Sequence, residues 1–139
     1  MFRALFSALV LGLCLIVVPS QAWAGSYLNR AAVLLDGAAA ERDMVRPRVQ
    51  DKELVELVRE IAEARVTSAG RMNVPAAVAT AHPHLLLALE NTERAYAAVL
   101  AGHLDKFILH LDRARAEDAT FRALMVERGY TMPGGAPPK

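Results

Sequence analysis

Apolar residues recur at intervals of three and four along most of the chain after residue 25, which is the period of an α-helix with one buried face. The first such stripe predicts a helix over residues 27–45, with Ser26 as its N-cap. The segment Arg46-Pro47-Arg48 ends this helix, because a proline disfavours helical geometry in the residue before it. The stripe consists of Leu28, Ala31, Ala32, Leu35 and Ala38 or Ala39.

A second helix is expected between Asp51, which is placed to cap it, and Ala69-Gly70, where it ends. Its charged residues recur on the side away from the apolar stripe, which is typical of a helix at the surface. The expected buried positions are Leu54, Leu57, Val58, Ile61 and Ala64, and the expected exposed positions are Glu53, Glu56, Arg59, Glu60 and Glu63.

The remaining apolar pattern predicts two further helices separated by Gly102. Pro83 marks the main start of the third helix, with His82 as its cap, and a shorter turn is expected before it around Pro75. Gly129 ends the fourth helix in the position where a left-handed residue closes many helices. The expected buried residues are Leu85, Leu86, Leu87, Ala88, Leu89, Tyr96, Val99 and Leu100 on the third helix, and Leu104, Phe107, Ile108, Leu111, Ala114, Phe121, Leu124 and Met125 on the fourth.

Four helices joined by short connections favour an all-α fold, a single up-down-up-down four-helix bundle over residues 25–130. No segment alternates with period two for long enough to indicate a sheet. Residues 131–139 are rich in proline and glycine and have nothing to bury, so the pattern predicts a disordered C-terminal tail.

Residues 1–24 have the features of a signal peptide. Arg3 is their one charge, residues 4–18 are apolar or small, and Ala22-Trp23-Ala24 offers small residues to a signal peptidase. Cleavage between Ala24 and Gly25 would export the protein to a bacterial periplasm or the extracellular space. Contact with the membrane is then expected only through an uncleaved signal peptide.

Two alternatives for this segment remain. A retained membrane anchor would need about 20 apolar residues, which is more than the run 4–18 provides. Lipidation at Cys14 would need a small residue before the cysteine, where Leu13 stands.

Composition narrows the function further. Arg3 is one of 16 basic residues against 15 acidic ones, so the chain from Gly25 onward is formally neutral and lacks the excess of cations that nucleic-acid binding needs. Cys14 is the only cysteine and lies in the signal peptide. The exported protein therefore has no disulfide, thiol nucleophile or thiolate metal site.

Histidines are the weak candidates for a metal site. His84 and His110 lie on the two predicted helices that flank Gly102, and a metal or haem carrier could use either of them with Met44, Met72 or Met125. No Cys-x-x-Cys-His haem motif occurs. We expect no bound cofactor, with His82 acting as a helix cap and the other histidines at half-buried or surface positions.

A polar cluster is expected inside the bundle. Glu93 interrupts the seven-residue series of Leu86 and Leu100, and Asp118 interrupts the series of Leu111 and Met125. A hairpin about Gly102 would bring Glu93 near Arg115, so the cluster Glu93, Arg115 and Asp118 is predicted to set the register of the helices. Arg42, in line with Leu28 and Leu35, is a further member or lies at the bundle end.

These features favour an exported, non-enzymatic module that binds another envelope protein or a second copy of itself, because the chain offers long amphipathic helices and no catalytic motif. The first alternative is the metal or haem carrier. The second is an enzyme that uses buried Glu93 and Asp118 as acid and base.

Overall fold

The computed structural model describes residues 19–133, with side chains from residue 24 onward. The described range is all-helical and contains four α-helices and two single 3-10 turns. Most of the predicted signal peptide (residues 1–18) and part of the predicted tail (residues 134–139) lie outside it. The elements are α2 (Pro19–Val45), η1 (Arg46–Arg48), α3 (Lys52–Gly70), η2 (Ala76–Val78), α4 (His82–Leu100) and α5 (Leu104–Glu127).

Helix α2 begins earlier than the sequence pattern predicts. It starts at Pro19 and continues through Ser26, so Ser26 is an exposed interior residue and its prediction as the N-cap is wrong. A proline fits the first turn of a helix because the N–H that it lacks would have no partner there, and no second proline follows before Pro47. The expected cleavage position between Ala24 and Gly25 therefore lies within α2.

The other helix ends follow local rules. Asp51 caps α3 as predicted, with its Oδ1 accepting a hydrogen bond from the Leu54 amide at 3.0 Å. Gly102 and Gly129 both adopt a φ of 79°, which confirms the two glycine turns on either side of α5. His82 is the first residue of α4 and not its cap, because the N-cap position belongs to Ala81.

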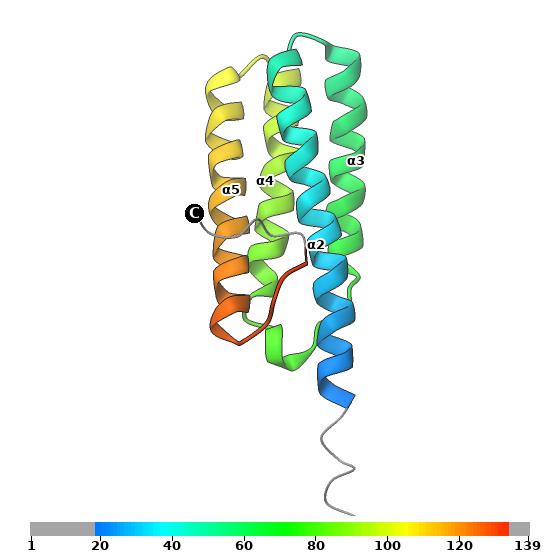
Figure 1. The fold of residues 1–139 in the computed structure, drawn as a ribbon. Coiled ribbons are helices and arrows are strands. Elements are labelled where there is room, and N and C mark those ends of the chain that lie inside the picture. The colour runs from blue at the N-terminus through cyan, green and yellow to red at the C-terminus, as the bar shows by residue number, and fades with distance from the viewer. Residues whose placement is uncertain (1–18, 134–139) are drawn as a thin grey trace, which may run out of the picture.

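The four helices lie side by side, and α4 and α5 share the most extensive contact (Figure 1). The residues of α4 that face α5 repeat at steps of four and three and are mostly small, so the two backbones approach closely. Helix α3 packs mainly on α4, and the contacts of α2 with its neighbours are less extensive. The α4 row is His84, Ala88, Asn91, Ala95 and Ala98.

Buried apolar residues form two clusters at opposite ends of the helices. The first also receives Tyr130 and Met132, both half-buried, so the expectation that nothing after residue 130 is buried is wrong for Met132. The first cluster contains Tyr27, Leu28, Ala31, Leu35, Ala38, Ala69, Val78, Ala81, Leu85, Ala88, Leu89, Phe121 and Met125. The second contains Val45, Val55, Val58, Ala62, Ala95, Tyr96, Ala98, Val99, Phe107 and Leu111.

The predicted buried face of α3 is wrong by about one residue's rotation, or about 100°. Its core-facing residues are Val55, Val58, Ala62 and Ala69. Leu57 and Ile61, which the apolar stripe places inside, are 55% and 40% exposed. The smaller side chains face the core because they let α3 lie close to α4, which leaves the larger ones outside.

Four more residues of the predicted stripes are exposed, namely Ala64 on α3, Leu87 on α4, and Leu104 and Ile108 on α5. In the part of the chain that the structure describes, no helix has the length and apolar character needed to cross a membrane.

Candidate functional site

A layer of polar side chains separates the two apolar clusters. Along each helix these residues lie between the members of the first cluster and those of the second, except for Arg122 and Asp36, which lie at the edge beside members of the first cluster. Helix α2 contributes Glu41 and Arg42, which are only 7% and 4% exposed. Residues of α3, α4 and α5 complete what we call the charged layer: Arg65, Thr92, Asp118 and Arg122, together with Asp36 at its edge on α2.

Each of the two buried charges of α2 contacts a different helix. Arg65 on α3 donates to Glu41 Oε2 at 2.8 Å. Arg42 donates to Thr92 Oγ1 on α4 at 3.0 Å, and Thr92 in turn donates to the Ala88 carbonyl oxygen at 2.9 Å. Breaking one partner of such a buried pair is costly, because the other charge stays buried without compensation.

Burial shifts the pKa values of groups in and beside the charged layer. Desolvation lowers the pKa of Arg42, and the Asp118 carboxylate acts in the opposite direction. Burial raises the pKa of Tyr96, and the nearby Glu41 carboxylate raises it further. Glu41 Oε1 and the Tyr96 hydroxyl have no hydrogen-bond partner among the described residues.

Arg122 joins α5 to α2 at the edge of the layer. It donates to Asp118 at 2.6 Å and to Asp36 at 2.7 Å. Burial alone would lower the pKa of Arg122, but its bonds to Asp118 and Asp36 outweigh that effect and raise it. Every described carboxylate of the layer thus contacts an arginine, which is the arrangement of structural ion pairs.

The predicted pairing of Glu93 with Arg115 is wrong. Glu93 accepts a hydrogen bond from Arg59 on α3 at 2.9 Å, whereas Arg115 is exposed and contacts Asp112 on its own helix at 3.4 Å. The reason is the rotation of α4: Asn91 faces α5, and a residue two positions later points about 200° away from it. Only Asp118 of the three predicted cluster residues lies in the charged layer.

His84 and His110 each contact a different partner. His84 Nδ1 lies 2.6 Å from Glu117 Oε2, and His110 Nδ1 lies 3.0 Å from Asn91 Oδ1. His84 and Asn91 are two helical turns apart on α4, or about 10 Å, so the two imidazoles do not converge. Within residues 19–133 no three His, Cys, Asp or Glu side chains are grouped in a way that could hold a metal ion.

The methionines of the carrier hypothesis are dispersed as well. Met125 is buried in the first apolar cluster, Met72 is half-buried beside it, and Met44 is exposed near the end of α2. None of them is the hydrogen-bond partner of His84 or His110. That partner is Glu117 for His84 and Asn91 for His110.

His82 takes part in a contact that the sequence pattern does not indicate. The Tyr27 hydroxyl of α2 lies 3.0 Å from His82 Nδ1. Burial lowers the pKa of His82 and raises the pKa of Tyr27 to about 12, so both groups are neutral near pH 7 and the imidazole tautomer sets the direction of this hydrogen bond.

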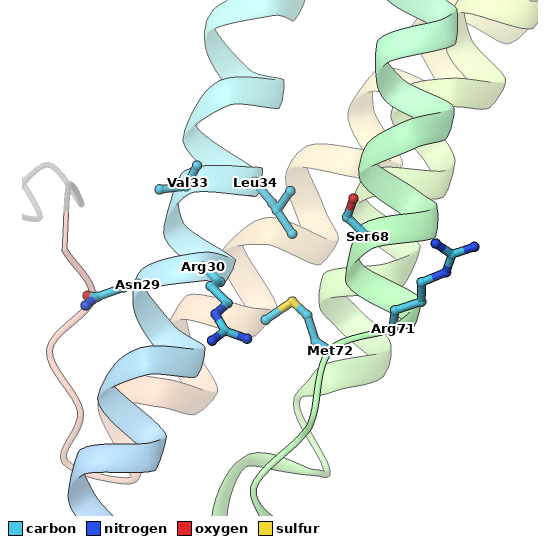
Figure 2. Close-up of a pocket in the computed structure, with 7 residues that line it drawn as sticks. All are labelled: Asn29, Arg30, Val33, Leu34, Ser68, Arg71 and Met72. Carbon is cyan, nitrogen blue, oxygen red and sulfur yellow. The ribbon is translucent and has the colours of Figure 1, made fainter.

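An apolar groove opens between α2 and α3 (Figure 2). Its volume is about 440 Å³, and its apolar wall is formed by Val33, Leu34 and Met72. The guanidinium-bearing side chains of Arg30 and Arg71 come from its opposite sides. Asn29 and Ser68 complete the lining.

Beside the groove, large apolar side chains lie exposed along the junction of the same two helices. Met44 and Val33 on α2, and Leu57 and Ile61 on α3, are each at least 40% exposed. The helical period places Leu57 and Ile61 on the flank of α3 that also carries Arg65, which binds α2. We call Met44, Leu57 and Ile61 the seam patch.

Glu41 is a buried member of the charged layer that the sequence pattern did not single out. Its signal was the spacing of Ala38, Glu41 and Val45, which places an acid on the buried stripe of α2. Its partner Arg65 could not be found this way, because periodicity assigns a residue to a face and does not say which helix lies opposite.

Comparisons with known proteins do not place the chain in a family. No family model matches it, and no curated protein or solved structure is significantly similar to it. Function must therefore be inferred from this chain's own residues.

Proposed function

We propose that the protein is an exported, non-enzymatic binding module of the cell envelope. In this proposal the signal peptide is cleaved between Ala24 and Gly25, and the remaining chain is an up-down-up-down four-helix bundle that binds another envelope protein or a second copy of itself. The observation that supports it best is the seam patch, whose three aliphatic side chains are 40–55% exposed in a folded domain. Large apolar side chains exposed in this way are a feature of interaction sites in soluble proteins.

The charges around the seam patch favour binding to a specific partner over nonspecific association. Glu53, Glu56 and Glu60 are exposed on α3 beside Leu57 and Ile61. An apolar centre with a charged rim is the usual composition of a protein–protein interface.

The carrier and enzyme alternatives gain no supporting contact. His84 and His110 each contact a separate partner, Glu117 and Asn91. Glu93 pairs with Arg59 on α3, whereas Asp118 pairs with Arg122 on α5, so the two acids belong to different ion pairs. A purified sample with a Soret band, or with stoichiometric metal that His84→Ala and His110→Ala remove, would favour the carrier instead.

The binding proposal is tested by sedimentation and by crosslinking in the envelope. A photo-crosslinking residue at position 61 should give one discrete adduct, and Leu57→Lys should abolish it. The matched control is Leu109→Lys on α5, which is similarly exposed but lies away from the seam patch and should leave the adduct unchanged. A monomer that gives no discrete adduct at position 61 would contradict the proposal.

Export is tested separately by mass spectrometry of the protein recovered from cells. The expected N-terminus is Gly25. An intact residue 1, or a lipid-modified Cys14, would overturn this part of the proposal.

A further inference from the structure

The groove between α2 and α3 combines an apolar wall with cations on opposite sides (Figure 2). Its volume of about 440 Å³ lies in the range of small-molecule sites, which is about 300–1,000 Å³. Val33, Leu34 and Met72 supply aliphatic and thioether surface. Val33 is 73% exposed, so the apolar wall faces solvent and has no cover within the described chain.

The polar groups of the lining limit what can occupy the groove. The one hydroxyl, Ser68 Oγ, already donates to the Ala64 carbonyl oxygen at 2.8 Å. The apolar wall has no hydrogen-bonding group, so a peptide backbone placed against it would lose its bonds to water without replacement. An alkyl chain has no such groups to satisfy.

Arg30 and Arg71 determine the charge of the expected ligand. Neither forms an ion pair with a carboxylate in the described chain. Figure 2 shows the Arg30 guanidinium on the side where the Met72 side chain lies, whereas the Arg71 guanidinium extends away from it beyond α3. A guanidinium in the position of Arg30 suits a carboxylate, which it can bind through charge-assisted hydrogen bonds.

We propose that this groove binds a single-chain anionic amphiphile, namely a long-chain carboxylate. The carboxylate binds Arg30, and the alkyl chain lies against Val33, Leu34 and Met72, with Arg71 adding positive charge on the far side of the groove. This site is separate from the seam patch and does not depend on a protein partner.

The test is the binding of dansyl-labelled undecanoate, a fluorescent long-chain carboxylate, to the mature protein. Saturable enhancement of fluorescence is expected, and decanoate should displace the probe better than its uncharged methyl ester. The variant Arg30→Gln should weaken binding about tenfold or more, because it removes the charge-assisted hydrogen bonds to the carboxylate.

Two control variants keep the experiment specific. Arg113→Gln removes an exposed arginine of α5 and should leave binding unchanged. Val33→Asp should abolish binding, whereas Val126→Asp, at a position that is 67% exposed on α5, should not. All of these positions are solvent-exposed, so each variant is expected to fold. Circular dichroism of each variant checks this.

Three outcomes would overturn the proposal. The first is the absence of saturable binding by the wild-type protein. The second is equal displacement by the ester and the carboxylate, which would indicate adsorption to any apolar surface. The third is binding to anionic phospholipid vesicles with none to free probe, which would indicate a membrane-facing surface. Loss of the position-61 adduct would leave this proposal intact, so the two fail independently.

Discussion

Helix α2 and the α4–α5 hairpin are held in place by different forces. The hairpin has the most extensive helix–helix contact in the described chain, and its facing residues on α4 are mainly small. Helix α2 has less extensive contacts, but its polar side chains bind α3 through Glu41, α4 through Arg42 and Tyr27, and α5 through Asp36. Close apolar packing therefore stabilises the hairpin, whereas the attachment of α2 combines buried apolar residues such as Leu35 and Val45 with contacts that depend on charge and protonation.

The difference bears on the proposed function. The seam patch and the groove both lie on the junction of α2 with α3, where α2 meets a neighbour through less extensive packing. A junction of this kind leaves apolar surface available to a partner or ligand.

The largest expected effect comes from the buried pair of α2. Arg65→Met leaves the Glu41 carboxylate buried without its partner and should lower the free energy of unfolding by about 3 kcal/mol or more. The double variant Glu41→Leu with Arg65→Met should be more stable than the Arg65 variant alone. Urea denaturation measures both.

The control for this pair is Arg94→Met, which breaks the exposed pair with Glu90 within α4 and should cost only about 0.3–0.5 kcal/mol. Equal losses in the Arg65 and Arg94 variants would show that α2 does not depend on its buried charges.

The hairpin should respond to loss of apolar volume. Leu111→Ala removes a side chain that is buried in the second cluster and should cost about 2–5 kcal/mol. Leu109→Ala, on the exposed side of the same helix, should change stability by less than about 0.5 kcal/mol. Thermal unfolding of the two variants compares them, and similar melting temperatures would mean that the faces of α5 are wrongly assigned.

A smaller effect is expected at the turn of the hairpin. Gly102 has a φ of 79° and open space around its Cα, so Gly102→Ala should cost about 1–2 kcal/mol from backbone strain alone. Gly70→Ala is the matched control, because Gly70 also has open space and no positive φ. That variant should be neutral or stabilising, and the reverse order of the two would refute the strain argument.

The smallest effect is the pH dependence of the Tyr27–His82 contact. Burial lowers the pKa of His82 in the folded protein, so below about pH 6.5 the unfolded chain binds more protons and stability falls as the pH decreases. His110 acts in the same direction, because burial and then Arg113, Arg94 and Lys106 lower its pKa.

His82→Gln should therefore reduce the loss of stability between about pH 7 and pH 5, as measured by urea midpoints. A variant with the same pH slope as the wild-type protein would show that His82 does not contribute.

Local rules predicted much of the fold. The all-helical class, the Asp51 cap, and the turns at Gly102 and Gly129 depend on residues near one another in the sequence, and the structure confirms them. The face of α3 was predicted wrongly, because the pattern ranks residues by hydropathy and the packing favoured the smaller Val55 and Ala62 over Leu57.

The candidate site was harder to predict. Asp118 was found because it interrupts an apolar series, but no partner was predicted for it, and the structure pairs it with Arg122. The partners of Glu41 and Glu93 depend on how each helix rotates about its axis. That rotation follows from the packing of all four helices together, so it cannot be predicted from the apolar stripe of one helix.

The most direct test of the contrast between α2 and the hairpin is native-state hydrogen exchange of the mature protein, in the wild type and in the Arg65→Met variant. We expect the amides of α2 to exchange through openings of lower free energy than those of α4 and α5, since α2 has the less extensive packing. The variant should lower the protection of α2 while that of the hairpin changes less. Equal protection of α2 and the hairpin in the wild type, or an equal loss in both in the variant, would contradict the account.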